Sequence, residues 1–284
     1  MKRLFFTKLS GAGNDFVLFD KNHNPEFELN TQFIAKVCNR RTGIGADGVI
    51  VISNREQTAF EMQYFNADGT TGSLCANGAR SALRYCKVNG RIGLAPVKFI
   101  ANDLEYLGQI LDDQKIKFYL NETKRLKVKF KIKAAGQLIT AAFIDTGAPH
   151  VVIKIDDVLV NTSNPGVFFS NIDEFPVREL GREIRYSKDF APEGTNVNFI
   201  SLVNGVIQIR SYERGVEDET LSCGTGSVAA ALVTYFNQSV PPPIKLLAKS
   251  GDELIVDFKV NNQIVRDLSL TGPAEIIFKG ELLI

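Results

Sequence analysis

The sequence predicts an α+β protein made of two similar halves, each an antiparallel-rich sheet curled around one buried helix. Two segments, 74–81 and 222–229, share a cysteine, a glycine three positions later, small residues and a helix-like run. Cys75 and Cys223 lie 148 residues apart (223 − 75) in a chain of 284, close to half its length. Further repeats keep the same order: residues 11–20 parallel 147–156, and 45–47 parallel 194–196.

In the first half, hydrophobic periodicity and turn residues predict the elements. One helix is expected over residues 31–41 and another from about 77 to 88, ended by Asn89-Gly90. On the second helix one face carries small and apolar residues and the opposite face is basic: Ala79, Leu83 and Cys86 against Arg80, Arg84 and Lys87. The expected strands are two within 3–20 around a Gly-rich turn, 49–52, 60–65, and a run of strands over 98–144.

The second half repeats this order. A helix over 224–236 follows Cys223 and is apolar on nearly every side, so we expect it to be buried all round. Asn237 is expected to end it, and the prolines at 241–243 prevent its resumption. The expected strands are 151–155, a hairpin of 199–203 with 206–212, then 245–248, 254–260 and a last one within 272–284.

Composition excludes several classes of protein. The net charge of +1 gives no electrostatic case for binding nucleic acid or an anionic membrane. Apolar stretches stay far below the roughly 18 residues that span a bilayer, and the N-terminus does not read as a signal peptide. The four cysteines show no CxxC pairing, so we expect no metal site, no disulfide framework and a cytoplasmic location.

Cys75 and Cys223 are the strongest functional candidates. A lone cysteine is more often a small core residue, and Cys38 and Cys86 are interpreted that way. A helix N-terminus carries partial positive charge and free N–H groups, which lower the pKa of a thiol and can bind a carboxylate. One sulfur, as thiolate, can remove a proton from one face of a carbon while the other, as thiol, returns a proton to the opposite face. We therefore expect inversion of an amino-acid α-carbon, without a cofactor, at a site built at the junction of the halves.

Three charged or titratable side chains have two readings each. His150 is either a turn or capping residue or a proton relay that tunes a thiol, since histidine titrates near neutral pH. Glu213 and Arg214 are either a solvated strand end, or a carboxylate that serves Cys223 and a guanidinium that binds a substrate carboxylate.

Four asparagines lie in Gly-rich turns, where asparagine tolerates the left-handed conformation. They also suit recognition of ammonium and carboxylate groups: Asn14, Asn66, Asn77 and Asn196. Residues 43–48 spell GxGxxG, but a helix precedes the motif and a strand follows it, so a dinucleotide site is rejected.

In this order the segments resemble diaminopimelate epimerases, over nearly the whole chain from residue 11 to residue 274. The most specific pieces are 65–69 (FNADG), 75–80 (CANGAR), 212–215 (YERG) and 223–226 (CGTG). The resemblance implies an isomerase that converts LL- to meso-diaminopimelate without pyridoxal phosphate, in lysine and peptidoglycan precursor biosynthesis.

The resemblance also assigns roles and an architecture. Cys75 and Cys223 would be catalytic, assisted by His150 and Glu213. It implies two pseudo-symmetric domains, 1–125 with the C-terminal strand 270–284 returning to it, and 126–269, in a homodimer. Substrate contacts would come from Asn14, Asn66, Ala76, Asn77, Asn196, Glu213, Arg214, Gly224 and Thr225.

The chain departs from the family pattern at three places. Ala148 stands where the family has an asparagine, Ala76 replaces a glycine, and residues 216–220 form a segment one residue longer. Ala148 keeps open a cofactor-independent two-cysteine racemase of another amino acid, such as proline, hydroxyproline or a basic amino acid. A third reading is a binding protein that captures a small amino acid on the two helix N-termini.

Overall fold

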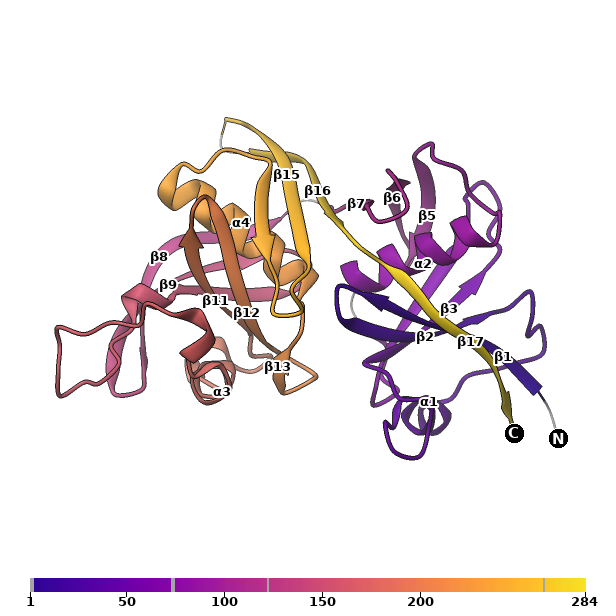
Figure 1. Ribbon diagram of the computed structural model, residues 1–284, viewed down its shortest axis with the longest axis horizontal. Helices are drawn as coiled ribbons and strands as arrows, with labels where there is room; N and C mark the ends of the chain where they lie inside the picture. Colours follow the sequence, from indigo (N-terminus) through magenta and orange to yellow (C-terminus); the bar gives the residue numbers. More distant parts are fainter. Residues whose placement is uncertain (1–2, 73–74, 122, 263) are drawn as a thin grey trace. The chain divides into compact units, whose positions relative to one another are not determined.

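The structure is a computed structural model that describes residues 3–72, 75–121, 123–262 and 264–284. The chain divides into two compact units, Met1–Leu120 with Thr271–Ile284, and Asn121–Leu270 (Figure 1). Leu74, part of the first cysteine segment, lies outside the described residues. Strands dominate both units, and the described residues of each form two α-helices, which confirms the predicted α+β class.

The first unit wraps a sheet around helix α2 (Ala76–Val88). The C-terminal strand β17 pairs antiparallel with β1, and α2 packs against β1, β2, β3, β4, β6, β7 and β17. The other elements are β1 (Arg3–Gly11), β2 (Asn14–Asp20), α1 (Thr31–Cys38), β3 (Gly48–Ser53), β4 (Glu61–Asn66), β5 (Val97–Ala101), β6 (Leu104–Ile110), β7 (Ile116–Tyr119) and β17 (Glu275–Leu283).

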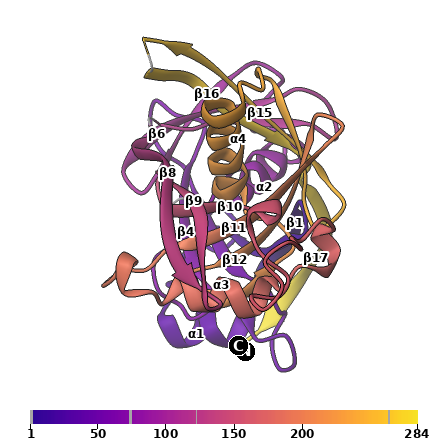
Figure 2. The same cartoon turned by 90° about the vertical axis from the view of Figure 1, so that its left-hand side faces the viewer.

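The second unit is built the same way around helix α4 (Gly224–Gln238), which packs against β8, β9, β10, β11, β12, β14 and β15 (Figure 2). Residues 226–233 of α4 are all buried, as its apolar composition predicts. The other elements are β8 (Lys124–Ala134), β9 (Gln137–Asp145), β10 (Pro149–Lys154), α3 (Val177–Arg185), β11 (Asn196–Val203), β12 (Val206–Glu213), β13 (Asp218–Thr220), β14 (Ile244–Leu247), β15 (Glu253–Asn261), β16 (Ile264–Gly272), and three short 3-10 turns at 155–157, 172–174 and 188–190.

The internal repeat extends to strand pairing. In the first unit β1–β2 is antiparallel, β2–β3 parallel, β3–β4 antiparallel, β4–β5 parallel and β5–β6 antiparallel. In the second unit β9–β10, β10–β11, β11–β12, β12–β14 and β14–β15 follow the same sequence of directions. Helices α1 and α3 occupy matching places in this order, as do α2 and α4. Each repeated sequence segment therefore marks a repeated structural position.

Several sequence expectations differ from the structure in detail. Helix α1 ends at Cys38 rather than at residue 41, because the Asn39 backbone is extended and its side chain accepts the next two free N–H groups, those of Arg41 and Thr42. Helix α4 continues past Asn237 to Gln238, where Ser239 takes the left-handed conformation. Helix α3 and strands β13 and β16 were not predicted.

The prediction that Arg80 lies on a face of α2 opposite the buried one is wrong. The side chain is fully buried, because strands surround this helix on nearly every side. Its guanidinium donates to Oδ1 of Asn77 at 2.8 Å and to the carbonyl oxygen of Ala76 at 3.3 Å. Arg80 therefore holds the first turn of the helix that begins after Cys75.

The described residues contain no helix that is both long and apolar enough to cross a bilayer. They also contain no group of three or more His, Cys, Asp or Glu side chains that could hold a metal ion.

Candidate active site

Cys75 is the N-cap residue of α2. Its backbone is extended (φ −99°, ψ 109°), and its Sγ accepts a hydrogen bond from the backbone N–H of Gly78 at 3.3 Å. A side chain in this position satisfies one of the unpaired N–H groups of the first helical turn. The thiol therefore lies where the helix dipole favours negative charge on sulfur.

Cys223 occupies the same position on α4. Its backbone has nearly the same angles (φ −112°, ψ 108°), and its Sγ accepts from the backbone N–H of Gly226 at 3.4 Å. The prediction of a thiol at each of two helix N-termini is confirmed. The residue is 6% exposed, whereas Cys75 is only partly buried.

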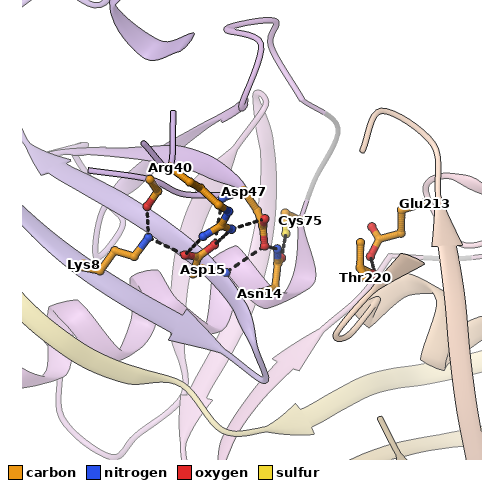
Figure 3. A network of polar contacts seen from close by, with 9 residues as sticks. Lys8, Asn14, Asp15, Arg40, Asp47, Cys75, Glu213 and Thr220 are labelled. Carbon is orange, nitrogen blue, oxygen red and sulfur yellow. Dashed lines mark hydrogen bonds and ion pairs between the residues drawn. The ribbon is translucent and has the colours of Figure 1, made fainter. Parts of the chain in front are cut away.

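Asn14, at the start of β2, contacts the first thiol. Its Oδ1 lies 3.6 Å from Sγ of Cys75, and its Nδ2 donates to Oδ2 of Asp47 at 2.6 Å (Figure 3). Asp47 also accepts from the backbone N–H of Asp15 at 3.2 Å. Asn14 thus links the sulfur to a partly exposed polar network.

That network is an alternation of cations and carboxylates. Arg40 binds Asp15 through two nitrogens, at 2.7 and 3.0 Å, and Asp47 at 2.8 Å (Figure 3). Lys8 donates to Asp15 at 2.6 Å and to the carbonyl oxygen of Gly45. Burial alone would raise the pKa of Asp15, but the bonds from Arg40 and Lys8 hold it below the usual value.

His150 lies within β10 and is fully buried. Its Nε2 is 3.0 Å from Oγ1 of Thr225, and its Nδ1 is 3.1 Å from Nδ2 of Asn198. Burial, with a smaller contribution from the charge of Arg214, lowers its pKa to about 3. Of the two readings of His150, the low pKa disfavours the proton relay, because desolvation disfavours the imidazolium. Oγ1 of Thr225 lies 3.8 Å from Sγ of Cys223, so His150 reaches this thiol through one hydroxyl.

Two residues at the end of β12 carry the candidate charges of the second unit. A carboxylate oxygen of Glu213 accepts a short hydrogen bond from the Thr220 hydroxyl (Figure 3). The backbone N–H of Arg214 donates to Oδ1 of Asn196 at 2.9 Å, and Nδ2 of Asn196 donates to the carbonyl oxygen of Pro149 at 3.1 Å. Asn196 therefore fixes the chain where β12 ends.

The remaining predicted contacts lie in the first unit or at the helix starts. Nδ2 of Asn66 donates to the Thr70 hydroxyl at 3.0 Å, and Asn77 is buried against Arg80. Both asparagine side chains thus have local structural partners. The two capped helices begin at Ala76 and Gly224, in the first turn, where backbone N–H groups have no partner within the helix itself.

The packing interpretation of the other two cysteines is confirmed. Cys38 and Cys86 are buried, and burial raises their pKa values to about 11 and about 12. Burial therefore disfavours the thiolate form of both side chains.

Sequence reasoning assigned no role to Arg40, Asp47, Asn198 or Thr220. One signal was available for Asp47: it belongs to the repeated segment 45–47, in which it aligns with Asn196 of segment 194–196. Asn198 carries no comparable signal, since its importance comes from strand pairing that places it beside His150.

The chain matches the family model described as diaminopimelate epimerase over residues 6–119 and 142–277. It is 35% identical to a protein named diaminopimelate epimerase from Aquifex aeolicus over 98% of this chain and 97% of that one. It is 36% identical to one from Methanocella arvoryzae over 99% and 98%. A third, from Chlorobaculum tepidum, is 34% identical over 96% and 99%.

Solved structures with the same fold are far more distant in sequence. A phenazine biosynthesis protein of the PhzF family from Bacillus anthracis superposes with a TM-score of 0.72 at 13% identity, covering 100% of both chains. A hydroxyproline epimerase from Agrobacterium vitis gives 0.68 at 13% identity, over 99% of this chain and 92% of that one. These likenesses establish the fold, while the full-length match to the family model and the relatives above 30% identity establish the family. This chain belongs to the diaminopimelate epimerase family.

Proposed function

We propose that this protein is an isomerase that converts LL-diaminopimelate to meso-diaminopimelate in lysine and peptidoglycan precursor biosynthesis, using two thiols and no pyridoxal phosphate. One observation carries the proposal: two thiols cap helices at equivalent positions of a repeated fold, each accepting from the N–H three residues on. The membership of a diaminopimelate epimerase family supplies the substrate.

In the proposed reaction one sulfur, as thiolate, takes the α-proton and becomes a thiol. The electron pair left on the carbon is delocalised into the carboxylate, which becomes enolate-like. The N–H groups at the starts of α2 and α4 stabilise this growing charge, as donors aimed at a developing oxyanion do. The second sulfur, as thiol, gives its proton to the opposite face and becomes a thiolate. Each turnover therefore exchanges the protonation states of the two thiols.

Other residues bind or position. Arg214 would bind a carboxylate of the substrate through its guanidinium. We assign His150 to positioning Thr225 rather than to proton transfer, because its imidazole is neutral and fully buried. Glu213 would serve Cys223 from the end of β12. The proposed substrate contacts from backbone and side chains are Asn14, Asn66, Ala76, Asn77, Asn196, Glu213, Arg214, Gly224 and Thr225.

The test is incubation of the purified protein with LL-diaminopimelate in deuterated water with no added cofactor. We expect meso-diaminopimelate carrying one deuterium at the inverted carbon, and no loss of activity after treatment with hydroxylamine, which removes pyridoxal phosphate. Absence of both deuteration and meso product would refute the proposal. Binding of diaminopimelate without α-proton exchange would instead indicate a binding protein.

Ala148 favours one alternative, a two-cysteine racemase of another amino acid. It is partly buried between β9 and β10, and its methyl group can make no polar contact with the far end of a substrate. Proline, hydroxyproline and lysine assayed in the same deuterium experiment decide between the two. Faster exchange with any of them than with diaminopimelate would favour the alternative.

A cytoplasmic location and a homodimer remain part of the proposal. Sedimentation equilibrium of the purified protein tests the dimer, and cell fractionation tests the location.

A further inference from the structure

The two thiols have matching caps but different polar neighbours. Besides the helix N–H, Sγ of Cys75 contacts a carboxamide oxygen, Oδ1 of Asn14, at 3.6 Å. Sγ of Cys223 contacts a hydroxyl, Oγ1 of Thr225, at 3.8 Å. An amide oxygen can only accept a hydrogen bond, whereas a hydroxyl can also donate one. The two neighbours therefore favour different protonation states if their orientations are fixed.

Asp47 fixes the orientation of Asn14. A carboxylate can only accept, so the atom of Asn14 that lies 2.6 Å from Oδ2 of Asp47 must be the NH₂ group. The oxygen then faces Sγ of Cys75 (Figure 3). There it accepts a hydrogen bond from the protonated thiol and repels a thiolate. Hydrogen bonding to the neutral form of an acid raises its pKa.

The charges behind Asn14 balance, so this network brings no net charge towards Cys75. Arg40 and Lys8 carry two positive charges, and Asp15 and Asp47 carry two negative ones. On α2 itself, the buried Arg80 lies in the first turn of the helix.

In the second unit Asn198 has an equally fixed orientation. Its Nδ2 donates to the carbonyl oxygen of Val151 at 3.0 Å, an atom that can only accept, and its Oδ1 accepts from the Ser211 hydroxyl at 2.9 Å. The same Nδ2 lies 3.1 Å from Nδ1 of His150. Because the NH₂ group has no lone pair to offer, Nδ1 of His150 must be the acceptor.

The tautomer of His150 follows. A neutral imidazole whose Nδ1 accepts carries its hydrogen on Nε2, which then donates to Oγ1 of Thr225 at 3.0 Å. Burial keeps the pKa of His150 low, so the ring stays neutral. A hydroxyl that accepts from His150 directs its own hydrogen elsewhere, and Sγ of Cys223 lies within reach at 3.8 Å. A donor aimed at the sulfur stabilises the thiolate.

The two chains of hydrogen bonds start from equivalent places. Asn14 and His150 align in the repeated segments 11–20 and 147–156, at the start of β2 and near the start of β10. The charged groups of the second unit near this chain are Arg214, whose charge acts on His150, and Glu213, which is hydrogen-bonded to Thr220. Each unit therefore has a cation near its thiol, Arg80 or Arg214. The two series of hydrogen bonds differ in direction: the one in the first unit presents an acceptor to its thiol, and the one in the second unit presents a hydroxyl that can donate.

We propose that Asp47 and Asn198 are positioning residues that make Cys75 the thiol and Cys223 the thiolate in the substrate-free protein. Asp47 acts through Asn14, and Asn198 acts through His150 and Thr225. This inference rests on the proposed two-thiol function and adds a direction to it. The isomer whose α-hydrogen faces Cys223 reacts at once, whereas the other isomer must wait for a proton to move from one sulfur to the other.

The experiment measures each thiol without substrate. The protein is alkylated with iodoacetamide from pH 5 to pH 10, and the peptides that contain Cys75 and Cys223 are quantified by mass spectrometry. The pH of half-maximal rate gives an apparent pKa that does not depend on exposure. We expect the value for Cys223 to lie below that for Cys75 by about one unit or more, a tenfold difference in thiolate fraction at neutral pH. Equal values or the reverse order would overturn the proposal.

Two sets of variants test the positioning residues. Thr225→Val should raise the apparent pKa of Cys223, and Thr225→Ser, which keeps the donor, should restore it. Asp47→Asn should lower the apparent pKa of Cys75 in the parent chain and leave it unchanged in the Asn14→Ala background. The same shift in both backgrounds would mean that the lost charge acts directly and would overturn the role of Asp47.

Two controls distinguish a change in thiol pKa from a loss of folding and from a failure of the proposed function. Thermal unfolding of each variant reports its stability, and if Asp47→Asn does not fold, Asn14→Ala alone should lower the apparent pKa of Cys75. Because no substrate is present, the order of the thiols can be read even if the protein does not epimerise diaminopimelate. A correct order without turnover would refute the proposed function and leave this inference standing.

Discussion

Gly226 and Gly78 are a matched pair for substitution, because each donates its backbone N–H to the cysteine that caps its helix. An alanine Cβ at position 226 would overlap Oδ1 of Asn198 and lie 3.0 Å from Sγ of Cys223. At position 78 the nearest atoms would be Cβ of Cys75 and Cε of Met62, both at 3.4 Å, an ordinary contact distance. The same substitution should therefore have opposite effects in the two units.

The change in the free energy of unfolding depends on which side chain must move to make room for the new methyl group. Asn198 is fully buried and hydrogen-bonded to Val151, His150 and Ser211, so it cannot yield without breaking bonds. Overpacking of a rigid site costs about 3 kcal/mol at the upper end of its usual range. Alanine in place of glycine within a helix recovers up to about 1 kcal/mol. Gly226→Ala should thus lose about 2 kcal/mol, and Gly78→Ala should gain up to about 1 kcal/mol.

Thermal unfolding of the two variants measures the difference. In a unit of this size each kcal/mol shifts Tm by about 2–4 °C, so Gly226→Ala should unfold about 4–8 °C below the parent. Its turnover should fall by about a hundredfold, the usual result of displacing a reacting group by an ångström. Gly226→Ala as stable as Gly78→Ala would refute the packing around Asn198 on which this reasoning depends.

Two further predictions concern buried charge. The Glu219 side chain is 3% exposed. Burial alone would raise its pKa, but Arg210 at 2.5 Å and Lys249 at 2.6 Å hold it below the usual value. Glu219→Gln should cost about 3 kcal/mol at pH 7. Its Tm gap to the parent should begin to close as pH falls below about 4.3, the ordinary pKa of a glutamate, and should keep closing as pH falls through the lower pKa of the folded carboxylate; a gap constant with pH would contradict this. His150 has a pKa of about 3 in the folded chain and about 6.5 in the unfolded chain. Between these pH values the unfolded chain binds more protons, so the free energy of unfolding that His150 contributes declines as pH falls from 6.5 to 3. Nitrogen NMR should show its ring neutral, with hydrogen on Nε2, from pH 8 to pH 5, and protonation near pH 6.5 would contradict the assignment.

The internal repeat made much of the fold predictable. A cysteine, a glycine three residues later and a helical run indicate an N-cap at Cys75 and at Cys223, and the structure has both. The cap is a local structure, because each cysteine side chain accepts from an N–H only three residues further on, so local sequence is sufficient there. The same holds for the turn at Asn204-Gly205, whose residues define the hairpin of β11 and β12.

Helix α3 was missed although its pattern was readable. Val177, Leu180 and Ile184 recur at helical spacing and are buried, but the helix is short and mostly charged. Its position also follows from the repeat, because α1 stands at the matching place in the first unit. Following the repeat through the polar segment before β11 would have found it.

The side-chain hydrogen bonds that lead to the two thiols could not be predicted from the sequence. Asp47 meets Asn14 across 33 positions, and Asn198 meets His150 across 48. These contacts depend on the register of the parallel pairs β2–β3 and β10–β11, which no local pattern specifies. Burial likewise lowers the pKa of His150 to about 3, so the ring is neutral at neutral pH, and burial is a property of the packed unit.

The most direct test of the central claim removes one sulfur at a time. Cys75→Ala and Cys223→Ala are assayed for conversion of LL- to meso-diaminopimelate, with thermal unfolding to show that each remains folded. Because inversion needs one sulfur on each face of the carbon, both variants should lose epimerisation, each by at least about a thousandfold. Near-parent turnover in either folded variant would contradict the two-thiol mechanism.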